Sequence, residues 1–183
     1  VGIRAMRGQY FSWLSHDDVY APDKVERQVG ALQRIDGPAM AFGDFATLNQ
    51  ETGERVEHHT GDGYDPRWPL LALTNYRING CATLLHRGCL ADGLWFDPRL
   101  PTTQDYDLWF RVASRYPVVH VPGIAVFHRL HSQQGSRSVR HVDEVSLLWL
   151  SVLDRLVADP AAAHVVPPLS ELQQSAAFRA SPM

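Results

Sequence analysis

The sequence predicts an α/β domain in which helices flank a mixed β-sheet. Strand-like apolar runs alternate with segments whose apolar residues recur every three or four positions, which is the pattern of a layered α/β domain. Two extended runs separated by turn-forming residues predict a hairpin, so the sheet is expected to be mixed and not purely parallel. The 183 residues are enough for one domain with a hydrophobic core.

The first half of the chain predicts three strands and a helix. An apolar and aromatic run ends in an acidic turn, and Pro22 then suits the first turn of an amphipathic helix. A further extended run is followed by turn-forming residues and a return strand. In chain order, the elements are expected at residues 9–14, 22–35, 39–48 and 55–58, with the acidic turn at 15–18.

The second half predicts three helices and two strands. A glycine near the start of a strand often marks close approach of a ligand or of another backbone, and Pro117 is expected to stop a helix. Residues 159–183 are rich in Ala, Pro and Ser and predict a flexible tail. In chain order, we expect helix 68–76, strand 78–85, helix 104–116, strand 118–127 with an interruption at Pro122 and Gly123, and helix 139–158.

Composition and charge narrow the function classes. The net charge is −3 and the basic residues are scattered, so no basic surface for nucleic acid is expected. No apolar run approaches the roughly 20 residues of a membrane span, and no secretory pattern opens the chain. Cys81 and Cys89 lack the partners of a zinc site and are interpreted as reduced structural thiols. We therefore expect a cytoplasmic protein, with attachment to the inner face of the membrane left open.

Asp17 and Asp18 stand where a predicted buried strand runs into a turn. Two adjacent carboxylates at a strand end can hold a hard divalent cation through oxygen. In the alternative interpretation, one aspartate caps the helix that begins at Pro22 and the other is solvated. The pair by itself does not decide between a metal site and a cap.

Two further groups of residues are candidates for chemistry. Asp105 and Asp107 open a predicted helix, where the dipole favours negative charge, so capping accounts for them without catalysis. His128 and His131 could share one ion in a helical segment, whereas in an extended segment they would point to opposite faces. The remaining candidates are interpreted as turn or hairpin residues: His16, His58 and His59.

Four segments occur in an order that resembles bacterial family 2 glycosyltransferases with the GT-A fold. Gly8–Gln28 resembles the family's metal-binding turn, in which a DXD-like element ends a strand, and the helix after it. Asn79–Cys81 is similar to the glycine loop beside the donor sugar, and Thr103–Trp109 resembles the acidic helix start that carries the catalytic base. Phe127–Ser136 resembles the Arg-x-His segment, whose histidine reaches the metal or the donor diphosphate.

The resemblance implies a GT-A-like fold and an inverting, metal-dependent transfer of a sugar from a nucleotide-diphosphate donor to a hydroxyl of a glycan, lipid-linked or other acceptor. It places residues 1–158 in the C-terminal portion of the GT-A domain. By position, the catalytic base is Asp105. The implied ligands of Mn²⁺ or Mg²⁺ are Asp17, Asp18 and His131, with His128 as second choice to His131. The implied donor contacts are Ser15, Asp18, Asn79, Gly80, Gln104 and Arg129.

The sequence departs from the family pattern at several points. Ser15 stands where many members carry aspartate, and Gln104 stands where many carry glutamate. The family's opening strand and loop, which hold the nucleotide base, are expected to be missing, and this would leave a sheet edge open to self-association. Two alternatives are therefore a non-catalytic, incomplete fragment and a metal-dependent phosphoester or pyrophosphate hydrolase.

Overall fold

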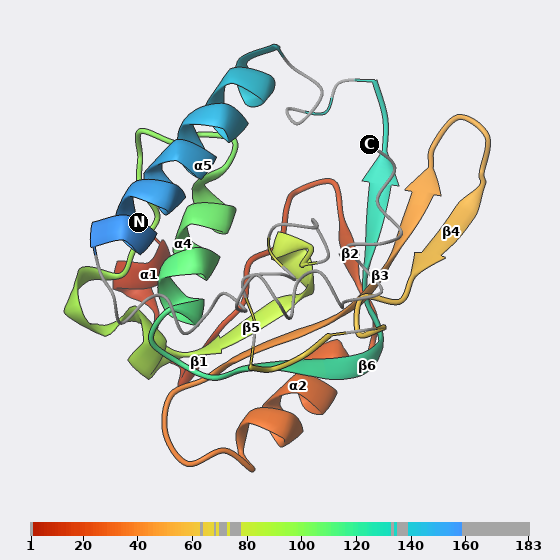
Figure 1. Ribbon diagram of the computed structural model, residues 1–183. Coiled ribbons are helices and arrows are strands. Elements are labelled where there is room, and N and C mark those ends of the chain that lie inside the picture. Colours follow the sequence, from red (N-terminus) through yellow and green to blue (C-terminus); the bar gives the residue numbers. More distant parts are fainter. Residues whose placement is uncertain are drawn as a thin grey trace.

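The computed structural model describes residues 2–62, 64–67, 69, 73, 78–132, 134 and 139–158. Its centre is a six-stranded sheet in which the strands lie in the order β1-β5-β3-β6-β2, with β4 paired to β3 (Figure 1). The pairing of β3 with β6 is parallel, and the other four pairings are antiparallel. The fold is therefore α/β with a mixed sheet, as the sequence predicts, and this architecture is GT-A-like.

Two long strands form the middle of the sheet. β3 spans Met40–Asn49 and β6 spans Val118–Leu130. One edge of β3 is shared, because β5 pairs with its first part and β4 with its second part. The shorter strands are β1 (Tyr10–Phe11), β2 (Val19–Tyr20), β4 (Arg55–His58) and β5 (Thr83–His86).

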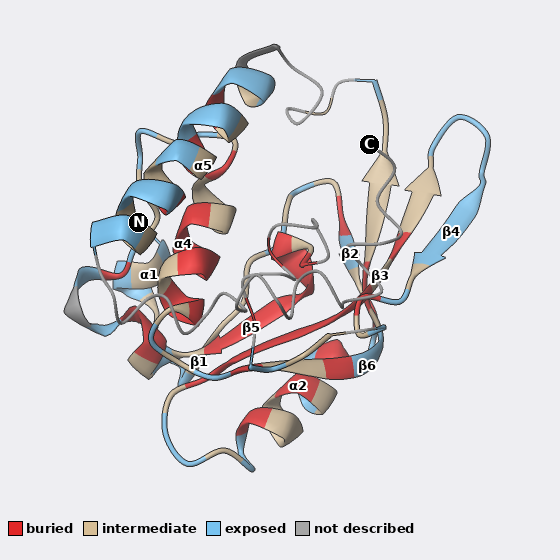
Figure 2. Ribbon diagram, in the orientation of Figure 1, coloured by how far each residue is buried: buried red, intermediate tan, exposed pale blue. Residues whose placement is uncertain are grey.

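Helices cover both faces of the sheet. α2 (Lys24–Leu32) lies on one face, and α4 (Gln104–Ala113) and α5 (Val139–Ala158) lie together on the other (Figure 1). Buried residues lie mainly along the central strands and on the sheet-facing sides of the helices (Figure 2). The shorter helices are α1 (Gly2–Ala5) and two 3₁₀ segments, η1 (Gly80–Ala82) and η2 (Arg87–Gly93).

The alternation of side chains along β3 divides the core into two layers. Met40 and Phe42 pack with the cluster beneath α4 and α5, where Trp109 is fully buried. Ala39 and Ala41 pack on the opposite face, toward α2. Successive strand residues point to opposite faces, so a single strand supports both helical layers.

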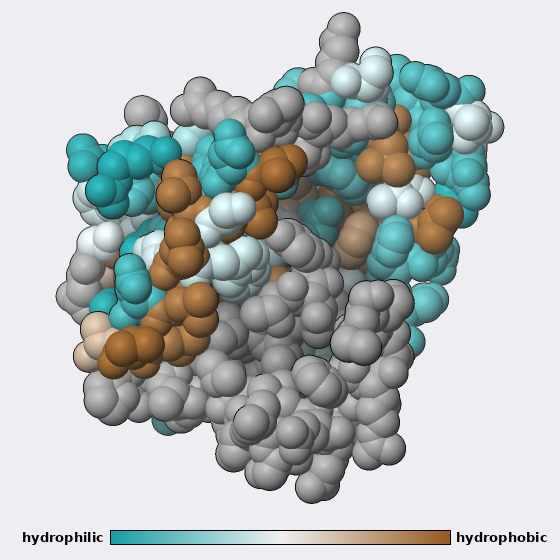
Figure 3. All heavy atoms as spheres, turned by 45° about the horizontal axis from the view of Figure 1, so that its top comes forward, coloured by the Kyte–Doolittle hydropathy of each residue, from teal (hydrophilic) through white to brown (hydrophobic). Residues whose placement is uncertain are grey.

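The outer side of α5 carries exposed apolar side chains. They recur at helical spacing, and apolar atoms gather over this helix in Figure 3. No helix in the described part of the chain is long and apolar enough to span a membrane. The large apolar residues exposed on α5 are Val142, Leu147, Leu150, Leu153 and Val157.

Most predicted elements are confirmed, and the differences have local causes. The strand expected at 78–85 begins only at Thr83, because the Asn79 side chain accepts the N–H of Cys81 and the chain turns through η1. β6 continues past the expected interruption, because a register shift leaves Pro122 and Gly123, the latter at φ 98°, without a partner in β3, and the pairing resumes at Ile124. The first strand is only two residues long. The predicted helix at 68–76 and the tail at 159–183 lie outside the described residues, apart from Pro69 and Leu73.

Candidate active site

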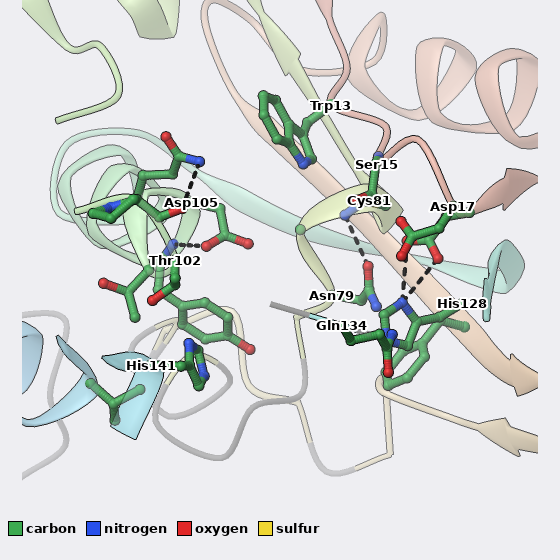
Figure 4. Close-up of a pocket in the computed structure, with 18 of the residues that line it drawn as sticks. Trp13, Ser15, Asp17, Asn79, Cys81, Thr102, Asp105, His128, Gln134 and His141 are labelled. Atoms are coloured by element: carbon green, nitrogen blue, oxygen red, sulfur yellow. Dashed lines mark hydrogen bonds and ion pairs between the residues drawn. The ribbon is translucent and has the colours of Figure 1, made fainter. Parts of the chain in front are cut away.

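A cavity of about 500 Å³ opens between the acidic turn and the first turn of α4. Figure 4 shows its two sides, with Trp13, Asp17 and His128 on one and Asp105 and His141 on the other. α5 supplies part of the second side. Eight of the residues predicted from sequence line this one cavity: Ser15, Asp17, Asp18, Asn79, Gly80, Gln104, Asp105 and His128. The predicted residues Arg129 and His131 are not among its lining residues.

Asp17 is held from the end of β6. His131 Nε2 lies 2.9 Å from its Oδ2, and Arg129 donates from Nε to its backbone oxygen. The hydrogen bond from His131 is the main cause that lowers the pKa of Asp17 to about 2; burial opposes this, and the nearby Ser15 hydroxyl adds a weaker lowering effect. Asp17 Oδ1 is buried and has no hydrogen-bond partner within the part of the chain that the structure describes.

Asp18 has a different role in the structure. Its side chain is 1% exposed, and His128 Nδ1 lies 3.1 Å from Oδ1 and 3.2 Å from Oδ2. The backbone N–H of Arg129 also donates to Oδ1, at 3.1 Å. The hydrogen bond with Asp18 is the largest cause that raises the pKa of His128 above its ordinary value. Both oxygens of Asp18 are therefore engaged, and this carboxylate orients His128.

The capping interpretation of the acidic pair is wrong. The residue that precedes α2 is Asp23, and both aspartates of the pair point instead to the end of β6. His128 belongs to β6 and His131 follows its last residue, so the extended geometry ends between them. This is why two histidines three residues apart reach two adjacent aspartates.

The donor set around Asp17 fits a divalent cation of the Mn²⁺ or Mg²⁺ type. Its buried Oδ1 lacks a hydrogen bond, and an imidazole nitrogen already faces the same carboxylate. Among the described residues, no group of three or more His, Cys, Asp or Glu side chains is placed to hold a metal. Magnesium sites commonly use one or two carboxylates together with substrate phosphates, so a small protein donor set is compatible with a substrate-completed site.

Asp105 faces the cavity from the first turn of α4. Its Oδ1 accepts the N–H of Tyr106 at 2.9 Å, within the first turn of the helix, while Thr103 stands at the N-cap and makes no side-chain capping bond. Burial raises the pKa of Asp105 to about 6. Gly80 lies against this side chain, and a Cβ at position 80 would overlap Asp105 Oδ2. Asp107 points elsewhere, into an ion pair with Arg111 at 2.6 Å.

The start of α4 is fixed by a carboxylate from α5. Glu144 Oε1 accepts the N–H groups of Thr102 and Thr103, both at 2.8 Å, and the Thr103 hydroxyl at 2.9 Å. Burial alone would raise the pKa of Glu144, but these hydrogen bonds lower it below its ordinary value. Because Asp105 follows two residues after Thr103, this contact sets where the first turn of α4 lies.

We expect Glu144→Leu to lower the free energy of unfolding by about 1–3 kcal/mol, because two backbone N–H groups lose their buried acceptor. Urea unfolding measures this change. Glu144→Gln keeps an acceptor oxygen and should lose less. Asp143→Asn is the matched control, because Asp143 is an exposed carboxylate on the same helix and its change should stay within about 0.5 kcal/mol. Equal losses in Glu144→Leu and Asp143→Asn would contradict the assignment.

Sequence reasoning missed several residues of the cavity. Helical periodicity places the α5 residues on one face but does not show that this face lines a cavity. Gln134 Nε2 lies 3.3 Å from His128 Nε2; the segment Phe127–Ser136 includes Gln134, but no role was predicted for this residue. The cavity residues not selected from sequence are Trp13, Phe45, Cys81, Pro101, Thr102, Thr103, Tyr106, Gln134, His141, Val145 and Leu148.

Comparison with known proteins gives one family and several relatives. The model of glycosyl transferase family 2 matches residues 1–93, which include the acidic turn and Gly80 but not α4. An uncharacterized glycosyltransferase of Rickettsia felis is 35% identical over 183 residues, covering 97% of this chain and 30% of that protein. Another from Rickettsia bellii is 35% identical over 164 residues, covering 86% of this chain and 24% of that protein.

A more distant relative is an uncharacterized glycosyltransferase of Haemophilus influenzae, 26% identical over 152 residues, with 77% of this chain and 46% of that protein covered. The chain thus spans less than a third of the length of the two Rickettsia proteins. Their similarity extends over α4, β6 and α5, beyond the residues that the family model matches. Since the family model covers half of the chain, this protein belongs to glycosyl transferase family 2.

Proposed function

We propose that this chain forms the catalytic part of a glycosyltransferase that moves a sugar from a nucleotide-diphosphate donor to an acceptor hydroxyl. One observation carries the proposal. Asp17 and Asp105 line the same cavity from opposite sides, and His131 Nε2 lies 2.9 Å from Asp17 Oδ2, although the three residues come from separate segments of the chain. Residues 1–158 then form the C-terminal portion of a GT-A domain.

Asp17 and His131 are the proposed ligands of Mn²⁺ or Mg²⁺. They would hold the ion, whose charge would offset that of the leaving diphosphate. Asp18 was also predicted as a ligand; its hydrogen bonds to His128 and Arg129 support instead a role in orienting the end of β6. Outer hydrogen bonds of this kind hold metal ligands in place.

Asp105 is the proposed general base, which accepts the proton of the acceptor hydroxyl. A pKa of about 6 leaves it mostly ionised at neutral pH while keeping it basic enough to take a proton. A single base opposite the leaving group implies direct displacement, and therefore inversion of configuration.

The proposed donor contacts lie around the same cavity. Ser15, Gly80 and Gln104 line it, and the Asn79 side chain accepts the N–H of Cys81 and so fixes the turn that carries Gly80. Arg129 is not among the lining residues; its Nε donates to the backbone oxygen of Asp17. We propose nucleotide sugars as donors and glycans, lipid-linked carriers or other hydroxyl compounds as acceptors. Self-association through a sheet edge also stays a proposal, and the outermost strands β1 and β2 are only two residues long.

The proposal is tested by calorimetric titration of the chain with uridine, guanosine and thymidine diphosphate-sugars. We expect one donor class to bind with Mn²⁺ present and to lose binding when EDTA removes the ion, because diphosphate and ion complete each other's coordination. An acceptor screen then follows, with product analysis. Release of free sugar or phosphate without an acceptor would support the hydrolase alternative, and a folded chain that binds no donor would contradict the proposal.

A further inference from the structure

The chain contains a single lysine, Lys24, against sixteen arginines. Lys24 is the first residue of α2, and its side chain is completely buried. In the described part of the chain it forms no ion pair. A buried ammonium without a carboxylate is costly, so its position needs a physical reason.

The ammonium group of Lys24 joins three segments. Its Nζ donates to the Ser12 hydroxyl and, at 2.7 Å, to the backbone oxygen of Thr83. It also lies 4.3 Å from the centre of the Tyr20 ring. A lysine ammonium is compact and carries several donors, so it can make all three contacts. An arginine guanidinium is larger and planar and has a fixed donor geometry.

The segments that Lys24 joins form one wall of the cavity. The Tyr20 hydroxyl donates to the Trp13 backbone oxygen at 2.6 Å and lies 2.8 Å from the Ser12 hydroxyl. The Ser15 N–H lies 3.2 Å from Cys81 Sγ, so the acidic turn rests directly on η1. Trp13, Ser15 and Cys81 all line the cavity (Figure 4).

Burial has a clear effect on this group. It lowers the pKa of Lys24 to about 7, far below the ordinary 10.5. The titratable groups that face the ammonium are Tyr20 and Cys81; burial raises the pKa of both, and that of Cys81 reaches about 12. Both are neutral near pH 7, so neither supplies a counter-charge. An apolar residue would fill the same space at a lower free-energy cost of burial, which indicates that the role of Lys24 lies in its hydrogen bonds.

We propose that Lys24 is a positioning residue that holds the segment Ser12–Ser15 against the turn Gly80–Thr83 and so shapes the wall on which a nucleotide diphosphate binds. The binding part of this inference rests on the proposed function, but the structural part does not. Lys24 touches no substrate; it acts through Ser12, Tyr20 and the Thr83 backbone.

The first test uses the fact that there is only one lysine. Protein labelled with ¹³Cε-lysine gives one side-chain signal, which is followed by NMR from pH 6 to 11. We expect a midpoint near 7. A midpoint near 10.5 would show that the ammonium is solvated, and this would overturn the inference.

The second test compares Lys24→Met with Ser12→Ala, which removes one acceptor of the same contact and leaves the lysine in place. We expect either change to weaken binding of uridine or guanosine diphosphate with Mn²⁺ by about tenfold. The double variant should bind the nucleotide no more weakly than the single variant with the lower affinity, because the two residues act as one unit. Gly30→Ala is the control on the same helix, since a Cβ there meets nothing within 4 Å.

Amide hydrogen exchange separates failure of this inference from failure of the proposed function. We expect Lys24→Met to speed exchange at the Ser15 N–H and to leave α4, on the other side of the cavity, unchanged. If the wild-type chain binds no nucleotide, the proposed function fails, while this exchange result still decides the role of Lys24. The positioning role of Lys24 would be overturned if the Lys24→Met variant folds and its Ser15 N–H exchanges at the wild-type rate. It would also be overturned if this variant binds the nucleotide with wild-type affinity.

Discussion

Replacing Asp105 by asparagine should lower the rate of sugar transfer by about 10²- to 10⁴-fold, the usual contribution of a general base. Asparagine keeps the size of the side chain and an oxygen that can accept the Tyr106 N–H, so the start of α4 should stay in place. The affinity for the donor should change little, because the base acts on the acceptor hydroxyl. Steady-state kinetics and donor calorimetry on the same protein measure both quantities.

The pH dependence gives a second measure of the same role. The pKa of Asp105 is raised to about 6, so the base becomes protonated as the pH falls through this value, and the rate of transfer should fall with it. Asp36→Asn removes an exposed carboxylate after α2, on the other face of the sheet, and should leave both rate and pH profile unchanged. Full transfer activity in Asp105→Asn would remove this residue from the mechanism.

Asp17→Asn should abolish metal-dependent binding of the donor. The carboxamide loses the charge and one acceptor oxygen that a hard cation requires, so the affinity for Mn²⁺ should fall by more than the roughly 10- to 100-fold that is typical of outer-shell changes. Calorimetry with Mn²⁺ and the nucleotide diphosphate measures this. Binding without metal should be the same in the variant and in the wild type.

Asp18→Asn is the informative comparison for this prediction. Its oxygens bind His128 and the Arg129 N–H, and asparagine can keep one of these bonds, so we expect a smaller loss than in Asp17→Asn. A larger loss in Asp18→Asn would instead make Asp18 the principal ligand, as the family resemblance allows. Wild-type metal affinity in Asp17→Asn would contradict a metal site at this turn.

Local patterns in the sequence predict much of the fold. The hairpin return at Arg55–His58 and the helix Val139–Ala158 have the predicted bounds, because turn residues and helical periodicity act over a few residues. The strand expected at 78–85 was displaced by the side chain of Asn79, a local competitor of the backbone that propensity alone does not reveal. Composition could not show how these elements pair in the sheet.

The candidate site was predicted only where the resemblance supplied its residues. Asp18 and His128 lie 110 residues apart in sequence, and Glu144 lies 41 residues from Thr103, so no local pattern joins them. Lys24 stands near the start of an amphipathic helix, where a lysine is normally solvated. Its burial depends on acceptors in β5 and in the segment before the acidic turn, which only the folded chain brings together.

The contact between Gly80 and Asp105 also has an evolutionary consequence. A methyl group at position 80 and a carboxylate at position 105 would occupy the same volume. A lineage that acquires a larger residue at position 80 must therefore move or shorten the acid at position 105, and the order of the two changes decides whether the intermediate protein can work. The two positions should vary together among relatives, although they belong to different elements and only the second carries a reactive group.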